Sequence, residues 1–143
     1  MLFNREIETM SRESLRELQN KRLRNTVQYV YEQVPYYREV FDRLSIKPSD
    51  IQTVEDLPKI PFTKKQILRD YYPFGLLAVP RENLIRIHAS SGTTGKPTVV
   101  CYTANDIDVF AEVNARSLAA GGGQEWAVGR LRNHESDPDT HVS

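Results

Sequence analysis

The chain has 143 residues, and 19 Lys and Arg residues balance 19 Asp and Glu residues, so its formal net charge is zero. A neutral chain of this length supports one modest core and gives no electrostatic case for binding nucleic acid or an anionic membrane. Cys101 is the single cysteine, which excludes an internal disulfide and a cysteine-built metal site. No apolar run is long enough for a membrane span or a signal peptide, so we expect a cytoplasmic protein.

Residues 1–80 are predicted to be mainly helical. Apolar residues recur every three to five positions from Ser11, the expected helix cap, to Val34. Pro35 stops or bends this helix, and a shorter helix that packs through Val40 and Phe41 follows.

Two further caps are predicted between these helices and residue 80. Thr53 and Asp56 stand three positions apart, which indicates a short capped helical turn. The segment 63–66 is expected to form a better capping box, in which the Gln66 side chain bonds the N–H of Thr63. The helix that it opens must end before Pro73.

Residues 84–102 are predicted to form a strand, a loop and a second strand. Apolar and polar side chains alternate from Leu84 to Ala89, and a second strand over Thr98–Tyr102 is expected to pair with the first in antiparallel fashion. His88 lies at the mouth of the loop and could reach a ligand, but we favour a packing role on the mixed face of the strand.

A helix is predicted over 103–120, capped by Thr103 and Asp106 and ended by the glycines 121–123. Its alanines permit close packing. Residues 124–143 have little periodicity and are expected to form a disordered tail. His134 and His141 have no supporting ligands there, so no metal site is predicted.

The loop Ser90–Thr98 packs five hydroxyl side chains, two glycines and one lysine into nine positions. Glycines allow several N–H groups to turn toward one centre, while the hydroxyls and Lys96 add donors and a positive charge. Only two residues separate the glycines, and Pro97 precedes a strand, so this is not a Walker A loop. The sequence therefore indicates a strand–loop–strand phosphate loop, and the alternative is a flexible hairpin turn without a ligand.

Several separate segments resemble phenylacetate–CoA ligases, which belong to the adenylate-forming acyl-CoA synthetase superfamily. The loop by itself is typical of the superfamily, and the flanking segments point to the phenylacetate ligases. The similarity runs from about residue 1 to residue 122 and is carried by 3–11, 34–38, 57–64, 72–76 and 86–98.

The resemblance implies an α/β fold: a helical region, a β-hairpin with the phosphate loop and one further helix. Residues 1–123 would form part of the N-terminal domain of such a ligase. It implies a reaction in which ATP and phenylacetate give phenylacetyl-AMP and pyrophosphate, and CoA then displaces AMP. ATP and Mg²⁺ are the implied cofactors and CoA is a co-substrate. The implied ATP phosphate ligands are Ser90, Ser91, Gly92, Thr93, Thr94, Gly95 and Lys96.

Members of that family are about three times as long as this chain, and most of their catalytic residues have no counterpart here, so no catalytic residue is predicted. A frameshift or a premature truncation of a ligase gene is our leading explanation for residues 124–143. The alternatives are a catalytically inactive helical module that binds a partner, such as an intact ligase subunit or a second copy of itself, and a separately encoded piece that complements a second polypeptide.

Overall fold

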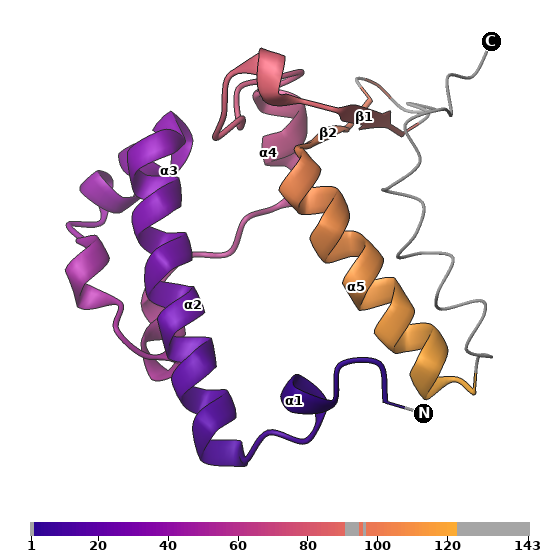
Figure 1. Ribbon diagram of the computed structural model, residues 1–143. Helices are drawn as coiled ribbons and strands as arrows, with labels where there is room; N and C mark the ends of the chain where they lie inside the picture. Colours follow the sequence, from indigo (N-terminus) through magenta and orange to yellow (C-terminus); the bar gives the residue numbers. More distant parts are fainter. Residues whose placement is uncertain (1, 91–94, 96, 123–143) are drawn as a thin grey trace, which may run out of the picture. The chain divides into compact units, whose positions relative to one another are not determined.

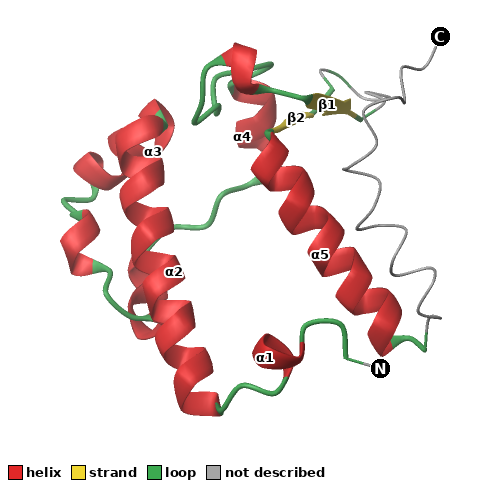
Figure 2. Ribbon diagram, viewed as in Figure 1, coloured by secondary structure: helices red, strands yellow, loops and turns green. Residues whose placement is uncertain are grey.

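The computed structural model describes residues 2–90, 95 and 97–122. The predicted tail 124–143 and most of the predicted phosphate loop lie outside these residues. The described residues group into two compact units: residues 2–10 with 104–122, and Ser11–Thr103. The predicted division at residue 123 remains a prediction. Figures 1 and 2 show the elements of each unit.

The larger unit holds most of the secondary structure. Its described elements are, in chain order, two α-helices, two short 3₁₀ turns, a third α-helix, a third 3₁₀ turn and a β-hairpin (Figure 2). The elements are α2 (Arg12–Gln33), α3 (Pro35–Arg43), η1 (Pro48–Asp50), η2 (Val54–Lys59), α4 (Lys65–Asp70), η3 (Arg81–Asn83), β1 (Arg86–Ala89) and β2 (Val99–Tyr102). The prediction of a helical region followed by an antiparallel hairpin and a later helix is confirmed.

The ends of α2 follow the local sequence signals. Ser11 caps its start, because the Ser11 hydroxyl accepts a hydrogen bond from the Ser14 N–H at 3.1 Å. Pro35 occupies the first turn of α3, where its missing N–H is not needed. Arg38 then bonds the carbonyls of Tyr31 and Glu32, which have no partner within the ending helix.

The core of the larger unit forms where α2 packs against α3, η1 and η2. Four buried apolar residues make this helical core, with five partly buried ones around it. They are Val27, Val40, Phe41 and Ile51, with Leu23, Tyr31, Tyr36, Ile46 and Ile60. Phe41 and Ile51 are 1% and 0% exposed, so most of the transfer free energy of both side chains is gained on folding.

The predicted cap at Thr53 and Asp56 is present. The Asp56 carboxylate accepts hydrogen bonds from the N–H groups of Thr53 at 2.9 Å and Gln52 at 3.0 Å. Lys59 lies 2.7 Å from the same carboxylate. The Lys59 ammonium and these two N–H groups hold the pKa of Asp56 well below its ordinary value.

The capping box predicted for 63–66 is wrong. The helix α4 begins at Lys65 with Lys64 as its cap residue and no side-chain cap. The Gln66 side chain donates to the Asp70 carboxylate at 2.8 Å, four positions along the helix, and is not bonded to Thr63. The Thr63 hydroxyl lies 3.3 Å from that of Tyr37 on α3. A tertiary contact and a pair on the helix surface thus replace the local cap.

The smaller unit consists of α1 (Arg5–Glu8) and α5 (Ala104–Ala120). Phe3 packs on Ala115 and Ala119, each 1% exposed, so the alanines of α5 give the close approach that the sequence predicts. Asn4 bonds Glu112 at 2.9 Å. The helix α5 ends at Ala120, directly before the predicted glycine stop.

Candidate functional site

The hairpin β1–β2 carries the predicted phosphate loop. Its antiparallel register pairs Arg86 with Tyr102 and Ala89 with Val99. A hydrogen bond from the Ile85 N–H to the Tyr102 carbonyl at 2.9 Å extends this ladder at its open end. Because alternate residues face opposite sides of a strand, this register determines which side chains flank the loop.

The two ends of the loop meet at Ser90 and Thr98, which we call the loop neck. The Ser90 N–H donates to the Thr98 carbonyl at 3.0 Å. The Thr98 N–H donates to the Ser90 hydroxyl at 3.2 Å, and the two hydroxyl oxygens lie 2.7 Å apart. Thr98 is 8% exposed, which makes it the one buried polar residue in the described part of the chain.

Gly95 is the other described residue of the predicted phosphate ligands. Its φ of +132° lies in a region that L-amino acids rarely adopt, and a Cβ added there would meet no atom within 4 Å. The backbone conformation therefore requires glycine here, while steric space does not. The other predicted ligands, Ser91, Gly92, Thr93, Thr94 and Lys96, lie outside the described residues.

His88 lies on the same face of the hairpin as Tyr102. Their rings meet edge to face, with centroids 5.0 Å apart. Such a contact is a packing interaction with a favourable aromatic geometry. The packing role that the sequence favours for His88 is therefore the one that the described contacts support.

The opposite face of the hairpin carries Cys101. A cavity of about 160 Å³ lies beside this thiol, lined by Leu68, Pro73, Leu76, Leu77, Val99, Val100 and Cys101. Burial raises the pKa of the Cys101 thiol above its ordinary value. A raised pKa keeps the thiol protonated at neutral pH, which agrees with the interpretation of Cys101 as a packing residue.

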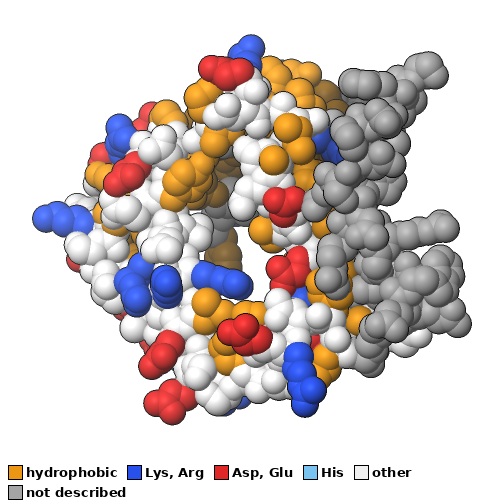
Figure 3. Space-filling view, viewed as in Figure 1, with side chains coloured by type: hydrophobic (Ala, Val, Ile, Leu, Met, Phe, Trp, Pro, Cys, Tyr) orange, Lys and Arg blue, Asp and Glu red, His pale blue; other side chains and the backbone are white. Residues whose placement is uncertain are grey.

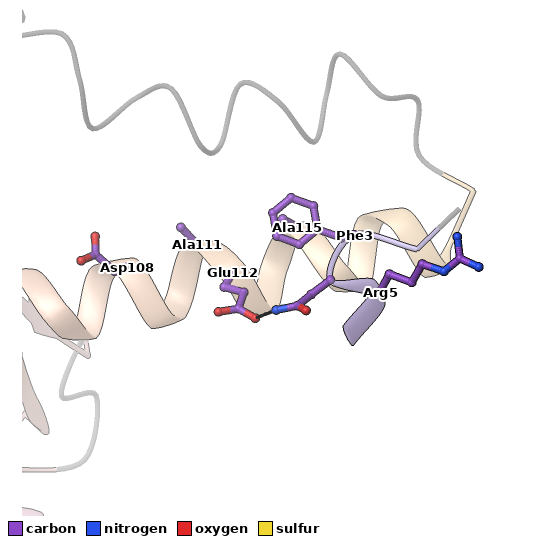
Figure 4. Close-up of a pocket in the computed structure, with 7 residues that line it drawn as sticks. Phe3, Arg5, Asp108, Ala111, Glu112 and Ala115 are labelled. Atoms are coloured by element: carbon purple, nitrogen blue, oxygen red, sulfur yellow. Dashed lines mark hydrogen bonds between the residues drawn. The ribbon is translucent and has the colours of Figure 1, made fainter. Parts of the chain in front are cut away.

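A larger cavity of about 420 Å³ lies in the smaller unit and was not predicted from the sequence (Figure 4). It is lined by Phe3, Asn4, Arg5, Asp108, Ala111, Glu112 and Ala115. The Asn4–Glu112 hydrogen bond lies at its edge and the Phe3 ring stands against α5. No local pattern could reveal it, because its lining joins residues about 100 positions apart.

The face of the molecule in Figure 3 shows no large patch of a single charge sign among the described residues. On the face in Figure 3, Lys and Arg side chains are interspersed with Asp and Glu side chains. Among the described residues no group of three or more His, Cys, Asp and Glu side chains is placed to hold a metal ion. None of the described helices combines the length and apolarity that a membrane crossing requires.

The described fold is similar to that of solved CoA ligase structures. The solved structure of 2-hydroxyisobutyryl-CoA ligase in complex with 2-HIB-AMP and CoA matches 76% of this chain with a TM-score of 0.69 and 31% identity. The match covers 24% of that chain. The fold of the described residues thus matches part of the fold of an adenylate-forming CoA ligase.

The curated proteins with similar sequences are phenylacetate-coenzyme A ligases, a narrower group than CoA ligases in general. The chain is 62% identical over 122 residues to the phenylacetate-coenzyme A ligase of Thermus thermophilus and 56% identical over 117 residues to that of Escherichia coli. These matches cover 85% and 82% of the chain. The chain is therefore homologous to the N-terminal portion of the phenylacetate–CoA ligases.

The chain spans about 27% of the length of these relatives. No protein-family model matches it.

Proposed function

We propose that this chain carries the ATP phosphate-binding loop of a phenylacetate–CoA ligase. The observation that supports this most directly is the hairpin, whose neck holds a Ser/Thr/Gly/Lys loop in a chain 52–62% identical to such ligases. In the complete reaction, a phenylacetate carboxylate oxygen attacks the α-phosphorus of ATP and pyrophosphate leaves. The CoA sulfur then attacks the acyl carbon and AMP leaves, which gives phenylacetyl-CoA.

The loop's task in this proposal is to hold the β- and γ-phosphates while pyrophosphate departs. Its backbone N–H groups, hydroxyls and the Lys96 ammonium donate to phosphate oxygens, and hydrogen bonds to a charged acceptor are stronger than those between neutral groups. The proposed ligands are Ser90, Ser91, Gly92, Thr93, Thr94, Gly95 and Lys96.

Mg²⁺ enters this proposal as part of the substrate, MgATP. It favours oxygen ligands and often binds through substrate phosphates and waters with few protein carboxylates. The hydroxyls of the loop fit that preference. The phosphate oxygens of the substrate would be ligands of the ion in this proposal. The bound ion offsets the negative charge of the phosphates.

Titration calorimetry with MgATP, magnesium pyrophosphate and AMP tests the loop. We expect saturable heats for MgATP and pyrophosphate but not for AMP, because AMP lacks the β- and γ-phosphates. Lys96→Ala removes a charged donor worth about 1–3 kcal/mol, so MgATP binding weakens roughly 5- to 150-fold. Lys64→Ala, which removes a lysine outside the loop, is the matched control. Equal binding of AMP and ATP, or equal effects of the two variants, would contradict the proposal.

The 143 residues span only about 27% of the length of the relatives that are named as ligases. We expect no phenylacetate-dependent AMP release from these 143 residues alone. Activity should appear when the chain is co-expressed with the remaining three-quarters of a relative such as the Thermus thermophilus ligase. Turnover by this chain alone would contradict this expectation, and a failure to complement would favour the second candidate below.

The second candidate is a non-catalytic interaction module, and the apolar surface of α5 favours it. Val109, Phe110 and Val113 are each more than half exposed, with fractions of 55%, 56% and 54%. Exposed apolar residues that gather on one helix mark a surface that another polypeptide covers. Size-exclusion chromatography with light scattering, with and without an intact ligase, tests this candidate. It is supported by a stable complex that forms without any gain of activity.

A further inference from the structure

Thr98 was not among the phosphate ligands predicted from the sequence, yet three hydrogen bonds join it to Ser90, which was. It accepts from the Ser90 N–H through its carbonyl, donates its own N–H to the Ser90 hydroxyl and shares a hydrogen bond between the two hydroxyls. Ser90 and Thr98 continue the register of the hairpin by one more pair beyond Ala89 and Val99. The loop neck is thus a cross-strand Ser–Thr pair.

Burial makes this pair costly to break. Thr98 is 8% exposed whereas Ser90 is exposed, so the Thr98 hydroxyl depends on Ser90 for its partner. A buried hydroxyl without a partner is strongly unfavourable. The hydroxyl pair therefore stabilises the arrangement in which the two ends of the loop stay together.

The hydrogen-bonding capacity of Ser90 is compatible with a second task. A serine hydroxyl has one donor and two acceptor positions. When Thr98 donates both its N–H and its hydroxyl hydrogen, both acceptor positions of Ser90 are filled, and the Ser90 hydrogen remains available. Ser90 is exposed and is the first residue of the loop, so that hydrogen can be donated to a ligand held there.

We propose that Thr98 is a positioning residue for phosphate binding: through Ser90 it holds the loop neck closed. This inference rests on the proposed function of the loop. A loop with joined ends loses less conformational freedom when it binds a phosphate than one with free ends, so the neck preorganises the site. Thr98 itself does not contact the phosphate.

Two variants of Thr98 separate the effect of losing the hydroxyl from the effect of changing the side-chain volume. Thr98→Val keeps the β-branched shape and removes the hydroxyl, whereas Thr98→Ser keeps the hydroxyl. Thr26→Val, on the exposed surface of α2, is the matched control. The full 143-residue chain is used, and amide hydrogen exchange and MgATP affinity are both measured.

We expect Thr98→Val to speed exchange of the Ser90 and Thr98 amides about tenfold and to weaken MgATP binding about fivefold to tenfold. Exchange in α2 should stay unchanged, which excludes a merely global loss of stability. Thr98→Ser should restore affinity to within about twofold of the wild type, and Thr26→Val should change neither quantity.

The two arms also distinguish this inference from the proposed function. If wild-type chain binds neither MgATP nor magnesium pyrophosphate, the proposed function fails, and hydrogen exchange alone decides whether the neck exists. If the amides of Ser90 and Thr98 exchange equally fast in the wild type and in Thr98→Val, the neck is overturned. If exchange rises while MgATP affinity stays the same, the positioning role is overturned.

Discussion

Replacing Phe41 by alanine tests the helical core most directly. The Phe41 side chain is 1% exposed and packs among Val27, Val40 and Ile51, with its ring centroid 6.1 Å from that of Tyr31. Truncating a fully buried phenylalanine costs about 3–5 kcal/mol, because transfer free energy is lost and a cavity remains. Since small domains unfold with about 5–15 kcal/mol, Phe41→Ala should remove a large part of the stability.

The chain offers a control with the same chemistry and the opposite environment. Phe62 is 97% exposed, so Phe62→Ala removes almost no buried area and should change stability by about 0.5 kcal/mol or less. Urea unfolding followed by far-ultraviolet circular dichroism measures both changes. Phe41→Leu should cost less than Phe41→Ala, because it leaves a smaller cavity, and it gives a measurable value if the alanine variant does not fold.

The urea midpoints of Phe41→Ala and Phe62→Ala can refute the central role of Phe41 in the core. If Phe41→Ala and Phe62→Ala shift the urea midpoint equally, Phe41 is not the centre of the core. A larger shift for Phe62→Ala would show that the segment around it is buried in solution.

Three further predictions concern individual contacts. Asp56→Asn should lower stability at neutral pH, because Lys59 and two backbone N–H groups depress the pKa of the Asp56 carboxyl. The stability that the ionised Asp56 carboxyl contributes is present above the unfolded pKa of about 4 and is lost as pH falls toward the folded pKa. The urea midpoints of wild type and Asp56→Asn should therefore converge in acid. A gap between the midpoints that stays constant with pH would refute this prediction. Gly75→Ala should cost about 1–3 kcal/mol in the same assay, because a Cβ would lie 2.9 Å from the Tyr71 carbonyl oxygen, and an unchanged midpoint would contradict that contact. Cys101 should react with a disulfide reagent more slowly in the native chain than in urea, because burial raises its pKa, and equal rates would contradict its burial.

Features that depend on neighbours along the chain could be predicted from the amino-acid sequence. The cap at Ser11, the break at Pro35 and the Thr53–Asp56 cap all follow from the side chains and backbone groups of residues within a few positions. The hairpin followed from the alternation of apolar and polar residues, which a strand with two different faces imposes. The composition of the predicted phosphate loop and the resemblance to the ligases could likewise be recognised without a structure.

Features that join residues far apart in the sequence became visible only in the folded chain. The capping box at 63–66 failed because Gln66 pairs with Asp70 and the Thr63 hydroxyl lies beside Tyr37 of α3. The 2.7 Å hydroxyl contact in the loop neck and the burial of Thr98 depend on the register of two strands. Burial and cross-strand partners are properties of the assembled fold, so only the structure could show that Thr98 is buried and bonded to Ser90.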